Sequence, residues 1–490
     1  MTLSRLHDAL RECAALLGPD RVCVDPVELA QVNTATFATH AQAPAILKPT
    51  SREQVAACLR IASRHQVPVY PVSTGKNWGY GSAVAPQHGC MLLSLAALNR
   101  IVEFDRQTGR VRLEPGVTFQ QLNTYLRDNA APFQAPYTGS GAQTSVIGNT
   151  MERGIGKGLY EDMAAHVHAC EALLANAEVL RTNLDVGGPA LFGLLPQGNL
   201  AVVVEITLQL EPAPRYSQLI TFPVPGGVSA LLHAVRELHD TSMRSAPRLQ
   251  LAFLNDYRIA SQIERFPHDT LDATQALPRA WMQTCLEPWH GAQWIGAGTL
   301  WADDADELAW RRQQLCAALA TLGLTPRLEV PIDGPPRELD DDGLRCAYWR
   351  KPFPMPSQPD PDRDRCGVVW IAPVVPLSAP DLDALITELE NTTLAHGMEP
   401  ALALRAGRAG SIRLVLGLFF DRDLAGADQR ALQCHAALNA LLRQAQVLRY
   451  RDSLLDAPAA LDPGVQSVLA VLKAHFDPHG ILAPQRYGRP

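Results

Sequence analysis

The stretch Pro71-Val-Ser-Thr-Gly-Lys-Asn-Trp-Gly-Tyr-Gly-Ser82 is the part of the chain that decides the fold. It ends a helix-then-strand pattern over residues 51–72, in which Ser51 is a helix N-cap and 67–72 is the strand. Because glycine has no Cβ, a glycine-dense loop after a strand lets backbone N–H groups approach a phosphate closely. The stretch therefore predicts a loop that binds a phosphorylated ligand, although glycine richness alone fits ordinary turns equally well.

A second glycine-rich loop spans residues 136–158 and follows a helix that we expect over 118–129. Neither loop contains the G-x-x-x-x-G-K-[ST] pattern of a P-loop. Neither opens a βαβ unit with an acidic residue about 20 positions further on, so the dinucleotide fingerprint is absent as well. Phosphate binding by these loops would therefore belong to another type of fold.

Composition limits the class of protein. A length of 490 residues favours two domains, and 47% hydrophobic with 19% charged residues is typical of a globular protein. The net charge of −7 argues against a nucleic-acid partner. No apolar run approaches the length of a membrane helix, and the N-terminal residues lack the apolar core of a signal peptide. The ten cysteines form no C-x-x-C pair, so we expect buried reduced thiols in a cytoplasmic protein.

The rest of the chain shows two kinds of secondary-structure pattern. Short strands at 101–105 and 110–114, joined through Thr108-Gly109, predict a hairpin, and 199–210 predicts a long strand. After residue 215, strand-like runs alternate with helical patterns at 228–240, 304–322, 378–396 and 426–445. A proline- and acid-rich stretch from Pro331 to Arg365 predicts a lid-like loop.

Five motifs taken together resemble the FAD domain of the vanillyl-alcohol oxidase and p-cresol methylhydroxylase family in both order and spacing. They are Pro71–Ser82, Leu113-Glu-Pro-Gly-Val-Thr118, Ser145-Val-Ile-Gly-Asn-Thr-Met-Glu-Arg-Gly-Ile-Gly156, Gln197-Gly-Asn-Leu-Ala-Val-Val-Val-Glu-Ile-Thr207 and Asp477-Pro-His-Gly-Ile-Leu-Ala-Pro484. The resemblance covers residues 40–212 and 445–490. The middle of the chain is similar only around 367–376.

The resemblance implies an α+β fold. A two-part FAD-binding domain of the p-cresol methylhydroxylase type would be formed by residues 1–215 and a C-terminal segment, 446–490. Residues 216–445 would form an α+β cap domain with an antiparallel sheet, which shapes the substrate pocket. Members of this family commonly form homodimers, although no segment here identifies an interface.

The resemblance also implies which residues bind FAD. Residues 73–81 would surround the pyrophosphate, 139–156 would cover the flavin and adenine side, and 199–207 would lie along the pyrimidine. The expected cofactor-binding residues are Ser73, Thr74, Gly75, Lys76, Asn77, Trp78, Gly79, Tyr80, Gly139, Ser145, Gly148, Asn149, Glu152, Arg153, Gly154, Gly156, Asn199, Val203 and Arg486. A dianionic pyrophosphate without a basic patch must be held by oriented N–H dipoles, which agrees with these glycine-rich loops.

Many members of this family attach the flavin covalently through a histidine or a tyrosine. By the resemblance, one attachment position is Lys76, and the other lies on a cap strand at Ile412 or Arg413. None of these residues is a histidine or a tyrosine, and no neighbouring cysteine replaces them. The sequence therefore predicts a dissociable FAD with a lower reduction potential than tethered relatives have.

The phenol-oxidising members bind the substrate as a phenolate through two tyrosines and an arginine, and the matching residues are Tyr80, Tyr450 and Arg451. A permanently charged guanidinium favours ionisation of a phenol, whose pKa is near 10 in water. Alternatively, Tyr80 packs in an interior and Arg451 pairs with an acid such as Asp452. All three are therefore hypotheses.

Asp162 matches the position of the family's active-site acid, which would transfer a proton beside the flavin. The neighbouring Glu161 could equally be that acid, or both could be surface charges. Ala96 lies near the position where the family gates oxygen, so either oxygen or another electron acceptor is possible. No metal is expected, since His166 and His168 lack a third ligand.

Three functions remain open at this stage. The leading hypothesis is an FAD-dependent oxidase or dehydrogenase that transfers a hydride from a small para-substituted phenol to flavin N5. The second keeps the flavin but changes the substrate to a hydroxy acid, an alcohol or an amine. The third is a flavin-binding partner protein without catalysis. The weakly matching cap leaves the substrate undecided.

Overall fold

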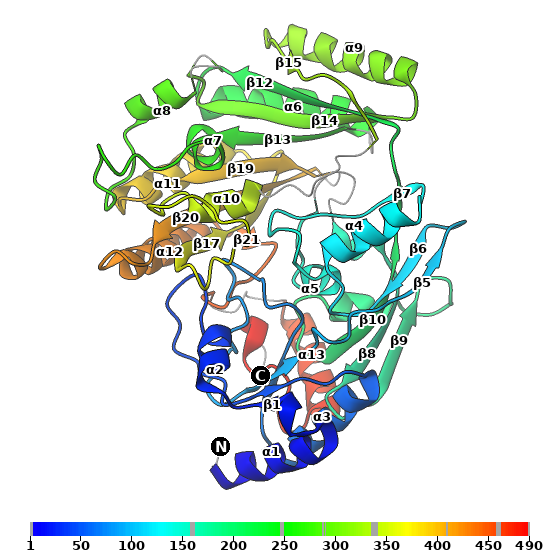
Figure 1. The fold of residues 1–490 in the computed structure, drawn as a ribbon. Coiled ribbons are helices and arrows are strands. Elements are labelled where there is room, and N and C mark those ends of the chain that lie inside the picture. The colour runs from blue at the N-terminus through cyan, green and yellow to red at the C-terminus, as the bar shows by residue number, and fades with distance from the viewer. Residues whose placement is uncertain are drawn as a thin grey trace. The chain divides into compact units, whose positions relative to one another are not determined.

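The structure is a computed structural model that describes residues 3–156, 162–245, 249–286, 289, 291–334, 342–407, 410–456 and 462–488. These residues fall into two compact units (Figure 1). The first unit takes those within Met1–Gly156, Asp162–Pro212 and Arg451–Pro490, and the second takes those within Ala213–Tyr450. Each unit is a separate body with its own sheet and core.

The first part of unit one is a helix pair over a small sheet of order β1-β2-β4-β3. Its elements are α1 (Leu3–Leu17), β1 (Val22–Cys23), α2 (Pro26–Val32), β2 (Ile46–Leu47), α3 (Arg52–His65), β3 (Val69–Val72) and β4 (Met91–Ser94). The Ser51 hydroxyl caps α3 by accepting from Gln54 N, and α3 ends where Gln66 adopts left-handed backbone angles. Its apolar stripe, including Val55 and Leu59, packs on α1, as the sequence pattern predicts.

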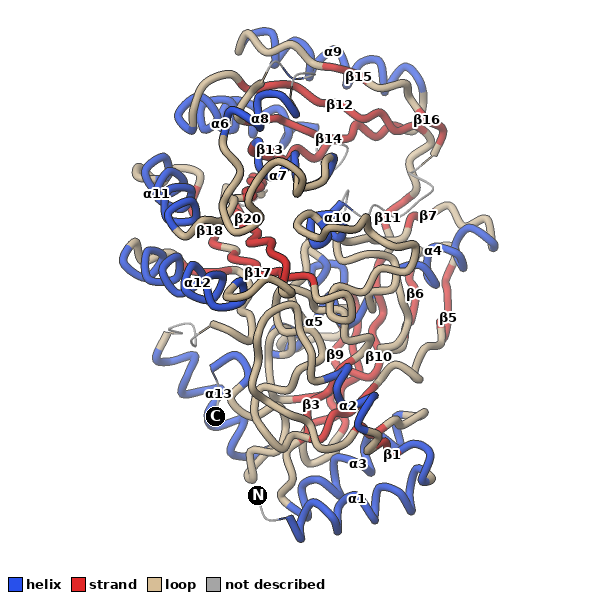
Figure 2. The backbone as a smooth tube through the Cα atoms, turned by 60° about the vertical axis from the view of Figure 1, so that its left-hand side comes forward, coloured by secondary structure: helices blue, strands red, loops and turns tan. Residues whose placement is uncertain are grey.

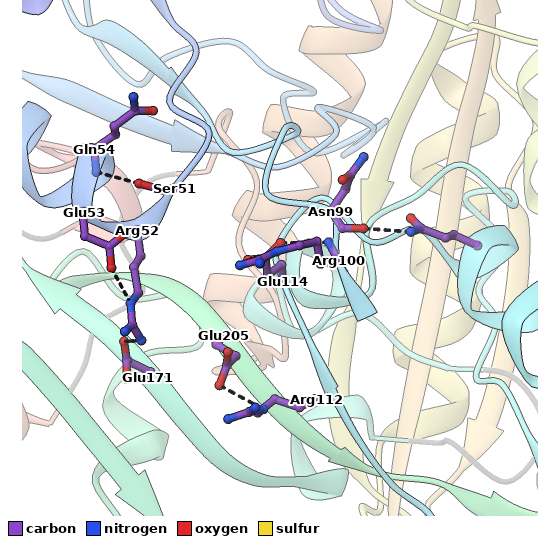
Figure 3. Close-up of polar contacts among 11 residues, drawn as sticks. Ser51, Arg52, Glu53, Gln54, Asn99, Arg100, Arg112, Glu114, Glu171 and Glu205 are labelled. Atoms are coloured by element: carbon purple, nitrogen blue, oxygen red, sulfur yellow. Dashed lines mark hydrogen bonds and ion pairs between the residues drawn. The ribbon is translucent and has the colours of Figure 1, made fainter. Parts of the chain in front are cut away.

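The second part of unit one is an antiparallel sheet of order β5-β6-β10-β8-β9. Its strands are β5 (Ile101–Asp105), β6 (Arg110–Leu113), β8 (Val167–Leu174), β9 (Val179–Asn183) and β10 (Ala201–Gln209). Around it lie α4 (Phe119–Asp128), β7 (Phe133–Gln134), α5 (Val146–Met151), the 3-10 turns 163–166 and 191–194, and β11 (Glu211–Pro212). Arg52 at the start of α3 donates to Glu171 of β8 at 3.0 Å and so joins the helix to this sheet (Figure 3).

The C-terminal residues return to unit one through backbone hydrogen bonds. Val69 N of β3 donates to Ile481 O at 2.7 Å, and Ala483 N donates back to Val69 O at 2.8 Å. At the end of α13 (Pro463–Phe476), the buried Lys473 ammonium donates to Asn199 O and Leu482 O, both at 2.8 Å. The C-terminal residues therefore complete the first unit, to which they add backbone pairing with β3 and a buried cation.

The second unit is built on a mostly antiparallel ten-stranded sheet of order β15-β12-β14-β13-β19-β20-β18-β21, with β16 beside β12 and β17 beside β20. The strands are β12 (Tyr216–Val224), β13 (Leu249–Asn255), β14 (Trp294–Ala302), β15 (Arg327–Leu328), β16 (Ile332–Asp333), β17 (Cys366–Ile371), β18 (Pro373–Pro376), β19 (Ala401–Ala406), β20 (Ser411–Asp421) and β21 (Leu448–Arg449). The helices are α6 (Val228–Ser245), α7 (Asp256–Ile263), α8 (Arg279–Cys285), α9 (Ala305–Thr321), α10 (Asp342–Tyr348), α11 (Leu382–Ala395) and α12 (Ala427–Gln444). Figure 2 shows α11 and α12 along one side of β17, β18 and β20, with α10 on the other side.

Most expected elements are confirmed. The hairpin through Thr108-Gly109 is β5–β6, and each of the four helical patterns after residue 215 forms a helix. The lid-like loop is wrong for residues 342–351. Cys346, Tyr348 and Trp349 are buried there, because the short apolar run packs α10 against α7. Residues 352–365 form no helix or strand, so a loop is present in that part of the stretch. Unit two also retains residues up to Tyr450, since β21 pairs with β18.

Candidate functional site

A cavity of about 980 Å³, including its open mouth, lies within the first unit. Its wall combines the loop after β3, the loop before α5, the start of β10 and three C-terminal positions, Arg451, Ala483 and Tyr487. Both ends of the chain therefore contribute to this cavity.

Side-chain oxygens hold the two glycine-rich loops in place. Ser145 N of the second loop donates to Thr74 Oγ1 of the first at 3.0 Å, and the Ser145 hydroxyl accepts from Gly148 N at 2.8 Å as the cap of α5. In the first loop, Gly79 N donates to Thr36 Oγ1 at 2.9 Å. Residues of both loops line the cavity.

Two glycines in these loops are required by the close approach of neighbouring atoms. Gly81 has φ +125°, and a Cβ there would lie 2.8 Å from Leu454 Cβ. A Cβ on Gly154 would lie 2.2 Å from the side-chain nitrogen of Asn149. Glycine at 81 therefore lets the C-terminal segment pack on the first loop, and glycine at 154 makes room for the Asn149 amide.

One end of the cavity is a polar cluster around Glu152. Arg486 lies 3.4 Å from its carboxylate, Tyr487 donates its hydroxyl to it, and Gln197 Nε2 donates to it at 3.3 Å. Burial raises the pKa of Glu152, but the positive charges of Arg486 and Arg451 and these hydrogen bonds outweigh burial, so its pKa is below the usual value. Burial also raises the pKa of the Tyr487 hydroxyl. The glutamate is therefore ionised and the tyrosine neutral.

Arg451 extends from the C-terminal segment into the wall of the same cavity. Its guanidinium donates to Asn77 Oδ1 and stacks on the ring of Tyr80, 3.8 Å from the ring centroid. The backbone of the next residue, Asp452, makes two hydrogen bonds with the Gln197 amide. Asp452 N donates to Gln197 Oε1 at 2.9 Å, and Gln197 Nε2 donates to Asp452 O at 3.0 Å. These contacts hold a permanent positive charge, 8% exposed, at the cavity wall.

The donors and acceptors of this wall fit the flavin part of FAD. One buried polar atom here, Asn149 Oδ1, has no hydrogen-bond partner among the described residues. A buried polar atom without a partner is costly, and the ring system of a flavin offers N–H donors. Glycine-rich loops, in which backbone N–H groups can approach a phosphate closely, also suit a pyrophosphate.

About half of the expected FAD-binding residues line the cavity. These are Ser73, Thr74, Gly75, Lys76, Asn77, Ser145, Gly148, Asn149, Glu152 and Val203. The expected residues that are not part of the lining are Trp78, Gly79, Tyr80, Gly139, Arg153, Gly154, Gly156, Asn199 and Arg486. Several of these support the wall instead: Arg486 lies behind Glu152, and Asn199 O accepts from Lys473.

The expected catalytic residues lie in different surroundings. Tyr80 and Arg451 are in direct contact in the first unit. Tyr450 belongs to the second unit, where its backbone N–H donates to Ala372 O at 3.1 Å. Asp162 is exposed and caps the 3-10 turn 163–166 by accepting from Ala164 N. Glu161, the alternative acid, lies outside the described residues, so the choice between the two acids stays a prediction.

Several polar residues of the lining were not among the expected site residues: Tyr70, Ser82, Ser140, Thr144, Gln197 and Tyr487. Tyr70 lies inside an apolar strand pattern, and Tyr487 lies beyond the last recognisable motif. Gln197 stands inside a quoted motif, but nothing in the pattern shows that its amide bonds the distant Asp452. Among the described residues, no cluster of three metal-ligating side chains occurs, and His168 instead pairs with Asp185 at 2.8 Å.

Comparison with known proteins agrees with this site. The family described as an FAD binding domain matches residues 43–183. A relative from Chondromyces crocatus, the 1'-carboxy-chondrochloren decarboxylase, is 35% identical over 99% of this chain and 98% of its own. The flavoprotein subunit of 4-cresol dehydrogenase (hydroxylating) from Pseudomonas putida is 32% identical over 44% of each chain.

Solved structures match over the whole length. p-Cresol methylhydroxylase with substrate bound has a TM-score of 0.89 at 21% identity, covering 100% of this chain and 98% of that one. The 4-ethylphenol oxidase of Gulosibacter chungangensis, in complex with isoeugenol, has a TM-score of 0.85 at 20% identity with the same coverage. These structural matches establish the two-part α+β fold, and the full-length sequence relative establishes common descent. The chain therefore belongs to the p-cresol methylhydroxylase type of FAD-linked oxidase family, and it is an FAD-dependent oxidoreductase that acts on a small molecule and passes electrons to an acceptor.

Proposed function

We propose that this enzyme oxidises a para-substituted phenol whose side chain carries a carboxylate, and that the oxidation is coupled to loss of carbon dioxide. The observation that carries the phenol is Arg451, a buried fixed cation at the cavity wall with an unpartnered Nε. The decarboxylation is supported by the full-length relative, whose name describes it as a decarboxylase.

Arg451 would bind the substrate oxygen as a phenolate. A guanidinium at hydrogen-bond distance stabilises the anion and lowers the pKa of a phenol toward neutrality. The ring of Tyr80 and the amide of Asn77 keep this guanidinium in place, so little reorganisation is needed when substrate binds. Tyr450 and Asp162 stay predictions as the second phenolate donor and the proton acceptor.

Bound FAD would supply a hydride acceptor for the benzylic carbon of the substrate. The electron pair of the bond broken when the adjacent carbon loses carbon dioxide would then restore the aromatic ring. For the chain, this requires that Arg451 hold the phenolate while the side chain reacts. It also requires that water be excluded, since water would otherwise add to the oxidised ring system.

The first prediction tests Arg451 directly. Arg451→Met keeps the length and stacking of the side chain but removes the charge, so the holoenzyme should retain FAD while its rate of flavin reduction by 4-ethylphenol falls about 100-fold or more. Stopped-flow bleaching without oxygen measures this. Arg449→Met, two residues away, is the control and should reduce normally.

The outcomes separate the roles of Arg451. Loss of FAD from Arg451→Met would assign the guanidinium to the cofactor rather than to the substrate. If the unmodified enzyme is bleached by D-lactate and not by alkylphenols, the phenol proposal fails and a hydroxy acid takes its place. Release of carbon dioxide from 3-(4-hydroxyphenyl)propanoate during bleaching tests the coupled decarboxylation.

A further inference from the structure

Arg258 of α7 is a buried cation without an anionic partner among the described residues. Its side chain is largely inaccessible, with the residue 8% exposed, and both Nε and Nη1 are buried without a hydrogen-bond partner. Its backbone N–H donates to Asn255 Oδ1 at 3.0 Å, and its backbone carbonyl accepts from Ser261 Oγ at 2.8 Å. Burying an unpaired charge is strongly unfavourable, because the charge loses its hydration without gaining a partner. The burial of Arg258 therefore calls for a functional explanation.

Other buried or half-buried cations of the second unit are paired with carboxylates. Arg350 is bonded to Glu399 and to two backbone carbonyls, and Lys351 donates to Asp421 at 2.6 Å and to Asp423 at 2.7 Å. The half-buried Arg279 reaches Glu390 at 3.2 Å. Arg258 differs from these residues, since each of them has a carboxylate partner and it has none.

The surroundings of Arg258 are aromatic and closely fitted. Its guanidinium carbon lies 5.0 Å from the ring centroid of Trp370 and 5.6 Å from that of Phe419, and the two rings meet edge to face. A Cβ at Gly417 would lie 2.5 Å from the Phe419 ring and 2.7 Å from the Trp370 ring. Glycine at 417 therefore leaves room for this aromatic pair, which supports the charge from one side only.

The aromatic pair beside Arg258 lies on one face of the sheet. Trp370 pairs with Gly417 in the register of β17 and β20. Because side chains alternate along a strand and directly paired residues share a face, Trp370, Gly417 and Phe419 lie on the same side. The apolar flank of Arg258 is therefore built into the sheet.

We propose that Arg258 binds the carboxylate of an aromatic acid, with Trp370 and Phe419 as the apolar flank of that subsite. A planar guanidinium binds a carboxylate through two parallel hydrogen bonds. A single cation in an apolar setting balances a monoanion, whereas a phosphate dianion would keep an uncompensated buried charge. Carboxylate binding at Arg258 does not depend on the proposed function.

The test compares a carboxylate with its neutral counterpart on the holoenzyme. 3-Phenylpropanoate and 3-phenylpropanamide lack the phenol hydroxyl, so neither depends on phenol oxidation, and calorimetric titration gives their dissociation constants. The enzyme should bind the acid at least tenfold more tightly than the amide. Arg258→Met should remove this preference, Arg258→Lys should retain part of it, and the exposed Arg265→Met should leave it unchanged.

A second measurement separates binding from a purely structural role. Without ligand, Arg258→Met should melt at a higher temperature than the unmodified protein, because it removes an unpaired buried charge. A lower melting temperature together with an unchanged acid preference would overturn the proposal. Equal affinity of the unmodified enzyme for acid and amide would overturn it as well, and so would binding of inorganic phosphate that Arg258→Met abolishes. If the acid preference depends on Arg258 while alkylphenols fail to bleach the flavin, the subsite stands and only the phenol substrate is lost.

Discussion

At the scale of single residues, Glu152 is the group whose charge matters most to the cavity. Its side chain is 17% exposed, and it contacts Arg486, Tyr487 and Gln197 from two distant parts of the chain. Its pKa is lowered in the folded state, because nearby positive charge outweighs the effect of burial. A lowered carboxyl pKa stabilises the fold above the pKa of the unfolded chain, and this stability is lost as the pH falls through the folded value.

Glu152→Gln should therefore destabilise the protein at pH 7 by on the order of 3 kcal/mol, the effect of removing one partner of a buried ion pair. The difference in melting temperature from the unmodified protein should shrink as the pH falls through the lowered pKa of Glu152, because the glutamate itself then becomes protonated. Thermal unfolding between pH 7 and pH 3.5 measures both. The exposed Glu178→Gln is the control, and a difference independent of pH would contradict the assigned charge.

The same residue shows what a sequence can and cannot predict about this site. Glu152 was expected from its place in a motif, because residues in the loops that approach FAD stay close together in the chain. Its hydrogen bonds with Gln197 and Tyr487 were not predicted. No local pattern encodes a hydrogen bond between residues that are more than 40 positions apart in the chain, as for Gln197, or more than 300 apart, as for Tyr487. Asp162 illustrates the converse: the resemblance predicts it as the active-site acid, whereas in the structure it caps a turn at the surface.

At the scale of elements, the pairing of β8 with β10 places two acidic residues directly opposite each other, Glu171 and Glu205. Glu171 has two arginine partners, Arg52 at 3.0 Å and Arg181 at 2.8 Å. Glu205 has only the longer contact of 3.7 Å with Arg112 that Figure 3 shows. Burial and then the charge of Glu171 raise the pKa of Glu205, although Arg112 opposes them.

A raised carboxyl pKa means that the ionised Glu205 costs stability, and this cost appears as the pH rises through the folded pKa. Glu205→Gln should therefore stabilise the protein at pH 7 by ~0.5 kcal/mol, the usual size of a cross-strand like-charge effect. Glu171→Gln should destabilise it, since two arginines lose their partner. Urea unfolding at pH 7 and pH 4 measures the free energy of unfolding of both variants. A destabilised Glu205→Gln would show that the contact of Glu205 with Arg112 outweighs its repulsion from Glu171.

At the scale of the whole molecule, the sequence predicted the two-ended unit well and the other unit poorly. The FAD-binding motifs are collinear and local, so β3, α3 and the β5–β6 hairpin followed from their patterns. In the second unit, the order of ten strands depends on contacts between residues far apart, which no motif marks. The burial of residues 346–351 likewise depends on α7 and on Asp421, not on the prolines and acids that suggested a lid.

Covalent attachment of FAD is also a question at this scale, because the resemblance implies possible attachment positions in each of the two units. In the first unit, the described residues of the cavity wall include no histidine or cysteine. The wall has two tyrosines, Tyr70 and Tyr487, but burial raises the pKa of both, which disfavours the nucleophilic phenolate. In the second unit, Ile412 is fully buried within β20 and has no nucleophilic group. We therefore expect FAD to be held without a covalent bond.

Precipitation of the holoenzyme with trichloroacetic acid should leave a yellow supernatant with the spectrum of free FAD and a colourless pellet. Dialysis against a chaotropic salt should give apoprotein that regains its colour with added FAD. A pellet that remains yellow and fluorescent on a denaturing gel would contradict this, and peptide mapping of that flavin would identify the tether. Because a covalent bond to the flavin raises its reduction potential in this family, a dissociable cofactor should also give a lower potential in a dye-coupled titration than the tethered relatives have.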